Sequence, residues 1–214
     1  MKLKIIIPAV LIAGAVGVLA FETLKKESKI TNKDELIVNM VGQVLEKWHY
    51  DPKMIDDNFS KEVFNKYIDD MDGEKKFLLQ TDINYLKKYE TTIDEEIKGQ
   101  QSLDFLTDAD SIFDVRLKQS EKIYPSILEK PFDFNRQDSI QLDRDKLAFP
   151  ADAAARRAVW YKMLKYRTLE KLLDLQKQQK RAVDTASIKK ESETQLEADA
   201  RKQVKKVYDL YFDR

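Results

Sequence analysis

The sequence has 214 residues, which is enough for one or two domains. Hydrophobic residues make up 43% and charged residues 36%, which is typical of a soluble helical protein and too apolar for a disordered chain. Lysine plus arginine equals aspartate plus glutamate at 38 each, so the chain lacks the basic excess of a nucleic-acid-binding protein. Cysteine is absent, which excludes disulfides, thiolate nucleophiles and cysteine-ligated metals.

The first 21 residues have the pattern of an export signal. A short basic segment, residues 1–4, precedes an uncharged apolar run over residues 5–21. This run is slightly long for the apolar core of a signal peptide and slightly short for a bilayer span of about 20 residues. We therefore expect residues 1–21 to be a signal peptide, or else an uncleaved signal anchor, and the remainder to be exported in either case.

A polar, lysine-rich linker over residues 22–33 leads into a helical domain predicted over residues 34–214. The first helix begins at Asp34 and ends before Asp51-Pro52, because a residue that precedes proline avoids the α region. Its apolar residues recur at helical spacing and predict one buried face. That face comprises Leu36, Ile37, Met40, Val41, Val44, Leu45 and Trp48.

A second helix begins after Asp56 or Asp57, either of which is a suitable N-cap. Asp72-Gly73 ends it, with Gly73 as the residue that can take a positive φ. Its apolar residues again fall at helical spacing: Phe59, Val63, Phe64, Tyr67, Ile68 and Met71.

A third helix is predicted over residues 82–98, capped by Thr81 or Asp82 and stopped by Gly99. A fourth covers residues 103–128, where Pro125 should kink or shorten the last turn.

Residues 129–149 show no sustained helical period, and we expect them to form a long ordered loop. The alternation of Ser139-Ile140-Gln141-Leu142-Asp143 suggests a brief extended pairing within it. Loops of this length inside a compact domain usually have a function or wrap against something.

A fifth, strongly apolar helix has Pro150 in its first turn and is followed by a mobile or solvated connection over residues 176–185. A last helix is predicted over residues 187–212. The sequence therefore predicts an all-α fold of about six amphipathic helices in an irregular bundle.

The sequence offers few residues that could form a catalytic or metal-binding site. His49 is the only histidine, and beside Trp48 and Tyr50 at a helix end it is expected to be a cap or packing residue rather than a general base. One histidine without cysteine does not make the usual nitrogen and sulfur zinc site. We therefore predict no catalytic, cofactor-binding or metal-binding residue in this chain.

The acidic stretch Asp69-Asp70-Met71-Asp72-Gly73 resembles the start of a calcium loop. If Gly73 took the sixth position of an EF-hand loop, Ile68 would be first and Leu79 twelfth, where the loop needs carboxylates. The calcium interpretation fails, and a solvated helix end followed by a turn explains the stretch better.

The nine serines occur in the linker, at helix caps or on polar faces, and none lies in a G-x-S-x-G motif. Ser60 with Lys61 is expected to be a pair on a helix surface, not a buried catalytic dyad. Both tryptophans, Trp48 and Trp160, are expected in the core, packed near each other.

A basic cluster near the end of the chain comprises Arg201-Lys202 and Lys205-Lys206. It could bind an acidic partner or lipid headgroups, but Glu197 and Asp199 nearby favour i, i+4 pairing on a solvated face. Two stretches remain as hypothetical contact surfaces: residues 189–195, which are almost wholly polar, and the loop over residues 129–149.

Two ordered blocks of the sequence carry a resemblance to a known family. The first block contains Trp48-His49-Tyr50, Phe59-Ser60, Tyr67, Met71-Asp72 and the string from Lys76 to Ile83. The second contains Phe132-Asp133-Phe134, Leu142-Asp143-Arg144, Phe149-Pro150-Ala151, Trp160, Leu164 and Lys165. Together they resemble the N-terminal helical domain of the bacterial tail-specific proteases, also called carboxy-terminal processing peptidases. Two local departures are Met71, where a leucine is expected, and Gln137-Asp138 in place of a more acidic pair.

The resemblance implies a periplasmic location and a parent enzyme that cleaves proteins from their C-termini with a serine–lysine dyad. Members of the family continue into a peptide-binding PDZ domain and a protease domain, neither of which is in this sequence. The expected role is thus a non-catalytic scaffold or regulatory module whose partners are those missing domains and protein substrates or an adaptor, with no cofactor and no nucleic acid. The membrane would be contacted only through residues 5–21, if they are uncleaved. The alternatives are a stand-alone exported helical adaptor or chaperone-like module, and a membrane-anchored scaffold.

Overall fold

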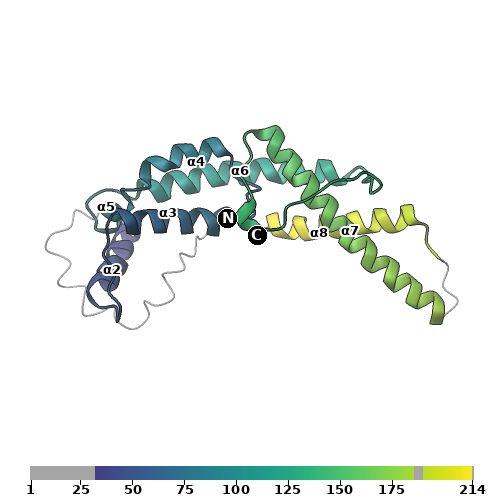
Figure 1. The fold of residues 1–214 in the computed structure, drawn as a ribbon, viewed down its shortest axis with the longest axis horizontal. Coiled ribbons are helices and arrows are strands. Elements are labelled where there is room, and N and C mark those ends of the chain that lie inside the picture. Colours follow the sequence, from purple (N-terminus) through teal and green to yellow (C-terminus); the bar gives the residue numbers. More distant parts are fainter. Residues whose placement is uncertain (1–31, 186–189, 214) are drawn as a thin grey trace. The chain divides into compact units, whose positions relative to one another are not determined.

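The computed structural model describes residues 32–185 and 190–213, and every regular element in them is a helix (Figure 1). The all-α prediction is therefore confirmed, and the predicted signal over residues 1–21 lies outside the described residues. Within the described loop, residues 139–143 form no strand, so the expected extended pairing is wrong. The elements are α2 (Lys33–Lys47), α3 (Asp57–Asp72), α4 (Gln80–Leu86), η2 (Lys87–Tyr89), α5 (Ile93–Ile97), α6 (Asp104–Leu128), η3 (Arg144–Lys146), α7 (Ala153–Thr185) and α8 (Glu193–Phe212).

The chain divides into two compact units, which we describe separately. Unit 1 consists of the described part of Met1–Gly73 together with Asp82–Ile112. Unit 2 consists of Glu74–Thr81 and the described part of Phe113–Arg214. None of the helices between residues 32 and 213 that the structure describes combines the length and apolar character needed to cross a membrane.

The first helix that the structure describes in unit 1, α2, is packed differently from the sequence prediction. Asn32 caps it by accepting hydrogen bonds from the backbone of Asp34 and Glu35, both at 2.9 Å. Its two buried residues are Asn39 and Gly42, while the predicted apolar face is only half-buried and Trp48 is 74% exposed. Asn39 donates to the backbone carbonyl of Ile97 in α5 at 3.2 Å, and a Cβ at Gly42 would lie 2.5 Å from the Ile97 Cγ2 methyl. A close backbone approach, which only glycine permits, thus decides which side of α2 faces α5.

Gly42→Ala is expected to lower the free energy of unfolding by about 1–2 kcal/mol, because overpacking against Ile97 outweighs the roughly 1 kcal/mol that alanine contributes inside a helix. Ile97→Leu removes the β-branch methyl that would clash. In that background Gly42→Ala should become neutral or stabilising, and urea denaturation of all four proteins in a double-mutant cycle measures the coupling. Equal effects of Gly42→Ala in both backgrounds would contradict the contact.

The predicted helix over residues 82–98 is instead three short helices, α4, η2 and α5. The backbone N–H groups of Glu90 and Thr92 donate to Lys87 and Tyr89, both at 3.1 Å, so the chain tightens into successive turns here. Gly99 has a φ of 72° after α5, which confirms it as the stop. At the end of α3, however, Gly73 has a φ of −64°, so the predicted positive φ at Gly73 is wrong. Lys75, two residues later, has the left-handed conformation instead, with a φ of 48°.

Ser60 of α3 is fully buried, which corrects the prediction that it lies on a helix surface. Its hydroxyl donates to Oδ1 of Asp94 and accepts from the Asp94 backbone N–H, both at 2.8 Å. The serine therefore caps the start of α5 from a different helix. Asp56, one of the two predicted residues, caps α3 itself by accepting from Asn58 and Phe59, both at 3.0 Å.

Ser60→Ala should cost about 1–3 kcal/mol of unfolding free energy, because it leaves the buried backbone N–H of Asp94 without an acceptor. The matched control is Ser111→Ala, which changes an exposed serine on α6 and should shift the free energy by less than about 0.5 kcal/mol. Thermal and urea unfolding followed by circular dichroism compares them; an equal, small effect of both changes would rule out the capping role.

In unit 2 the core is organised around Trp160 of α7, whose side chain is fully buried. Its indole N–H donates to the backbone carbonyl of Lys76 at 2.8 Å, and its ring lies 5.7 Å from Phe77 and 5.5 Å from Tyr208. Arg156, also buried, donates to the carbonyl of Phe77 at 3.0 Å. The segment Glu74–Thr81 is therefore tied to α7 by side chains that satisfy its backbone.

The helices α7 and α8 correct several predicted boundaries. Asp152, not Pro150, sets the start of α7, since its carboxylate accepts from the backbone of Ala155 at 2.8 Å. Residues 176–185, expected to be a solvated connection, continue α7 to Thr185. Ser192 caps α8, which begins at Glu193 rather than at residue 187. The fourth helix is correct in extent, because α6 runs through Pro125 to Leu128.

Candidate functional site

His49 lies in a turn after α2 and contacts its neighbours in sequence, Tyr50 and Asp51. Its Nδ1 atom is 2.8 Å from the backbone carbonyl oxygen of Asp51, and its ring lies 4.9 Å from that of Tyr50. Tyr50 is 94% exposed. This geometry is that of a residue in a turn after the helix, and the neighbouring Trp48 and Tyr50 are at the surface rather than packed.

The acidic stretch over residues 69–73 ends α3. Asp69 and Asp70 are exposed, and Asp70 pairs with Lys66 at 2.5 Å, but Asp72 is buried. The expectation of a solvated helix end is therefore wrong at Asp72. Within residues 32–185 and 190–213, no group of three or more histidine, aspartate or glutamate side chains is arranged to hold a metal ion.

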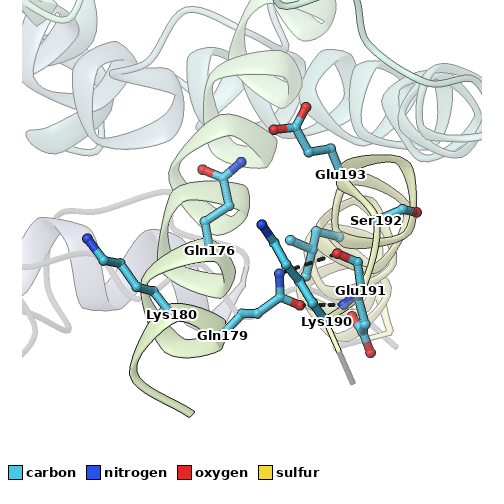
Figure 2. A pocket seen from close by; sticks show the side chains of 8 residues that line it. Gln176, Gln179, Lys180, Lys190, Glu191, Ser192 and Glu193 are labelled. Atoms are coloured by element: carbon cyan, nitrogen blue, oxygen red, sulfur yellow. Dashed lines mark hydrogen bonds between the residues drawn. The ribbon is translucent and has the colours of Figure 1, made fainter. Parts of the chain in front are cut away.

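A polar pocket of about 830 Å³ lies where the end of α7 faces the start of α8 (Figure 2). Gln179 spans it: its side-chain oxygen accepts from the Glu191 backbone at 2.7 Å, and its amide nitrogen donates to the Glu191 carbonyl at 3.3 Å. Residues 190–193, part of a predicted contact surface, form one wall of the pocket and are exposed. Residue 189 lies outside the described residues.

The loop over residues 129–149 is ordered by unit 2 itself. The backbone N–H of Phe132 donates to Glu197 at 3.1 Å, and Phe132 is buried. Asp138 pairs with Lys165 of α7 at 2.6 Å, and the lysine holds the pKa of Asp138 below its usual range. Because these contacts are internal, they account for the order of the loop without a partner.

The basic cluster on α8 is paired along the helix, in part as predicted. Arg201 contacts Glu197 at 2.8 Å and also donates to the carbonyl of Leu128 at 2.8 Å, while Lys205 contacts Asp209 at 2.7 Å. The Arg201–Glu197 pair is largely buried, so the expected solvated face holds for Lys205 but not for Arg201.

Unit 1 contains an apolar groove of about 170 Å³ between α2, α3, α5 and the start of α6. Its lining residues from α2 and α3 are mostly half-buried aliphatic and aromatic side chains. They are Ile37, Val38, Val41, Gly42, Leu45, Phe59, Val63 and Tyr67. The segment from α5 to α6 supplies Ile93, Glu96, Ile97, Leu103, Phe105 and Leu106.

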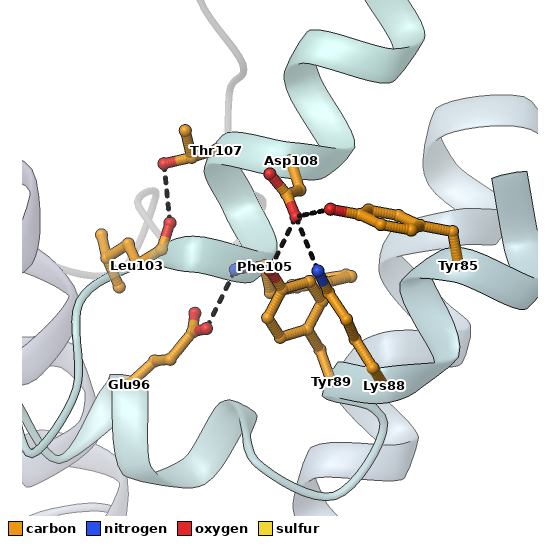
Figure 3. Close-up of polar contacts among 8 residues, drawn as sticks. All are labelled: Tyr85, Lys88, Tyr89, Glu96, Leu103, Phe105, Thr107 and Asp108. Atoms are coloured by element: carbon orange, nitrogen blue, oxygen red, sulfur yellow. Dashed lines mark hydrogen bonds and ion pairs between the residues drawn. The ribbon is translucent and has the colours of Figure 1, made fainter.

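Glu96 is the only charged residue of this lining, and it is 4% exposed. Its Oε1 atom accepts from the backbone N–H of Phe105 at 2.9 Å, so it caps α6 from α5 (Figure 3). Burial raises the pKa of the Glu96 carboxyl to about 7; the Phe105 N–H opposes this, and the negative charge of Asp104 adds to it. A carboxyl with such a pKa changes its charge close to neutral pH.

Near Glu96, Asp108 of α6 accepts hydrogen bonds from three donors (Figure 3). The hydroxyls of Tyr85 and Tyr89 donate to Oδ2 of Asp108 at 2.9 and 2.6 Å, and the Lys88 ammonium lies 3.2 Å away. The Lys88 Nζ atom also lies over both tyrosine rings, 3.9 and 4.5 Å from their centroids. The tyrosine hydroxyls and Lys88 hold the pKa of Asp108 below its usual range, so this cluster ties α4 and η2 to α6.

Comparison with known proteins places this architecture in a family. Residues 41–214 match the tail specific protease N-terminal domain family. The chain belongs to this family. A tail-specific protease from Haemophilus influenzae is 32% identical over 162 residues, which cover 71% of this chain and 23% of that protein. This chain thus spans about a quarter of the length of the relative.

Within this tail-specific protease domain, sequence reasoning missed Glu96. The residue lies inside the apolar spacing of Ile93 and Ile97, three residues after the first and one before the second. That spacing indicates that the Glu96 carboxyl faces inward, because residues next to the apolar stripe of a helix lie on the same side of the helix as the stripe. The predicted continuous helix concealed that Glu96 sits in the last turn of a short helix, where it can reach the start of α6.

Proposed function

We propose that this chain is the non-catalytic scaffold and regulatory N-terminal domain of a periplasmic tail-specific protease, a serine-type enzyme that processes proteins from the C-terminus. The observation that carries the proposal is the family match over residues 41–214, together with a named protease relative of which this chain covers 23%. The domain would position a PDZ and a protease domain of the same parent protein and shape the access of substrates or an adaptor.

The architecture is compatible with such a role. Buried aromatic side chains and a satisfied backbone around Trp160 give unit 2 a rigid core. The C-terminal half of α8 exposes Val207, Leu210 and Tyr211 at 63, 56 and 48%. Large apolar side chains that cluster at a surface favour contact with another protein surface, which other domains of the parent protein would supply.

The decisive experiment starts from the gene. The reading frame beyond Arg214 is sequenced, and the whole protein is expressed with and without residues 22–214. Cleavage of a test protein with a C-terminal tag is then compared between the two. A matched pair of point variants, Val207→Asp and Leu210→Asp in the whole protein, separates a specific surface from the gross effect of a deletion.

If the proposal is right, a PDZ and serine–lysine protease sequence follows, and both the deletion and the α8 variants alter the rate or the choice of cleavage site. Unchanged cleavage after deletion would contradict a regulatory role. A frame that ends at Arg214 would instead favour the alternative, a stand-alone exported adaptor. The location is tested separately by fractionation and by mass spectrometry of the mature N-terminus, which distinguishes a cleaved signal peptide from an anchor over residues 5–21.

A further inference from the structure

The loop over residues 129–149 is fixed to unit 2 near its start by two phenylalanines. Phe132 is buried, and its backbone N–H donates to the carboxylate of Glu197 on α8 at 3.1 Å. Phe134 packs against a cluster of buried side chains from α7 and α8, which are Leu172, Leu196 and Ala200. The chain therefore leaves the surface of the two helices only after Phe134.

The end of the loop is fixed to the segment Glu74–Thr81 of the same unit. The Lys75 ammonium contacts the backbone carbonyl of Leu147 and lies 5.3 Å from the centroid of the Phe149 ring. The backbone N–H of Gln80 donates to the carbonyl of Pro150, which is buried, at 2.8 Å. Since both ends are held, movement of the loop is confined to the residues between them.

The middle of the loop, residues 135–143, is held much more weakly, and we call it the strap. All of its residues are described by the structure, and all except the half-buried Ile140 are exposed. Leu142, the other large apolar residue of the strap, is 61% exposed. Within the strap, Asp138 is the only residue with a hydrogen bond or ion pair to α6, α7 or α8. Segments with so few buried apolar contacts are the ones that open locally.

A turn marks each boundary of the strap. At its start, the carboxylate of Asp133 accepts from the backbone N–H of Asn135 at 2.9 Å. At its end, the carboxylate of Asp143 accepts from the backbone N–H of Asp145 at 3.2 Å. Such aspartate turns are stabilised by side chains within the loop itself. They can therefore persist whether or not the strap contacts α7.

The contact that joins the strap to α7 is a charged pair. Oδ2 of Asp138 lies 2.6 Å from Nζ of Lys165, and Arg136 Nε lies 3.5 Å from the other carboxylate oxygen. The Lys165 side chain is only 10% exposed, and its Nζ atom lies 5.9 Å from the centroid of the Phe134 ring. Lys165 holds the pKa of Asp138 below its usual range, so the carboxylate is ionised at neutral pH. Attraction between two opposite charges thus supplies the closure that apolar burial does not.

We propose that the strap, residues 135–143, is a conformational device that the Asp138–Lys165 pair holds closed against α7. It opens on the turns at its two ends while the helices of unit 2 stay folded. Opening separates Lys165 from its carboxylate and exposes the ammonium beside Lys162, an exposed residue of the same helix. Because salt weakens the attraction between charges that solvent can reach, a rise in ionic strength favours the open form. This inference goes beyond the scaffold role proposed above and does not depend on it.

The absence of cysteine allows a direct test with two introduced thiols. Ser139→Cys in the strap and Lys177→Cys on α7 are both exposed positions, and each carries a nitroxide label. Pulsed electron paramagnetic resonance then measures the distribution of distances between the labels in the full chain. We expect one narrow distribution at about 0.1 M salt. Between about 0.1 and 1 M salt, where the screening length falls from about 10 to about 3 Å, a second and longer distance should grow.

Matched variants assign this change to the ion pair. Asp138→Ala should raise the ratio of open to closed strap about tenfold at low salt, because it removes a hydrogen bond between charged groups. It should also leave little further response to salt. Asp145→Ala changes an exposed aspartate of the same loop outside the strap and should behave like the original protein. Lys165→Glu should open the strap, and its combination with Asp138→Lys should close it again.

Several results would overturn the proposal. These are an unchanged distribution in Asp138→Ala, an equal change in Asp145→Ala, or a strap that stays open after the charges are exchanged. The helical circular dichroism of each variant is recorded in parallel. A loss of helix that accompanies the longer distance would show unfolding of the unit rather than movement of the strap, which also overturns it. Since Asp138 is an exposed residue of a loop, its variant tests the inference even if Lys165→Glu does not fold.

Discussion

Trp160→Ala is expected to lower the free energy of unfolding by about 3–5 kcal/mol, the usual cost of removing a large buried aromatic side chain. The Trp160 side chain has no exposed surface, and its ring borders Phe77 and Tyr208. The change also leaves the Lys76 carbonyl, which accepts the indole N–H at 2.8 Å, without this donor. Guanidinium denaturation followed by circular dichroism measures the loss.

The chain contains its own control for this experiment, because its other tryptophan is at the surface. Trp48 is 74% exposed after α2, so Trp48→Ala should change the free energy of unfolding by less than about 0.5 kcal/mol. Trp160→Phe, which retains an aromatic ring but not the N–H, should fall between the two alanine variants. Similar losses for Trp48→Ala and Trp160→Ala would contradict the assignment of Trp160 as the centre of the unit 2 core.

Glu96→Gln should make the protein more stable at pH 8 and almost unchanged at pH 4.5. Burial disfavours the charged form and raises the pKa of Glu96 in the folded protein to about 7, above its ordinary value of 4.5. Between these two values the folded protein binds more protons than the unfolded chain, so the stability falls as the pH rises from about 4.5 to about 7 and is constant above. Burying this charge costs on the order of 3 kcal/mol at pH 8, and glutamine removes that cost.

The measurement is urea denaturation of the original protein and the variant at half-unit steps from pH 4 to pH 8.5. The free energy of unfolding of Glu96→Gln should rise relative to that of the original protein between pH 4.5 and 7. Glu96→Ala separates charge from capping, because it removes the acceptor of the Phe105 N–H as well. It should therefore be less stable than Glu96→Gln at every pH, by about 1 kcal/mol. Parallel pH profiles for the original protein and Glu96→Gln would show that Glu96 is not the group that titrates.

The positions of several helices were accessible from the sequence because they depend on local chemistry. Asp56 was one of two predicted caps for α3, and Gly99, with a φ of 72°, was the predicted stop before α6. The start of α6 was predicted within one residue, and its end at Leu128 was correct. Caps and glycine stops act within a few residues, so a single sequence contains the information that they need.

Other features could not be read from spacing, because contacts between distant segments decide them. The sequence predicted Ser60 at the surface, but contact with α5 buries it. The periodicity predicted one helix where turns at Glu90 and Thr92 separate shorter ones. On α2, the apolar period pointed to one buried face, but Gly42 allows α5 to approach from another side. A periodic pattern identifies apolar positions and leaves open which of them a partner helix covers.

The sequence by itself determined that this protein is all-α. Its two blocks of family residues were also enough to predict a tail-specific protease N-terminal domain, which the family match confirms. Only the tertiary structure decided that Trp160 is buried while Trp48 is exposed, and that Glu96 enters an apolar groove. The physical reason is the range of the forces involved. Helix formation and capping are local, whereas burial, and with it the pKa of a carboxyl, depends on side chains that the fold brings together from remote parts of the chain.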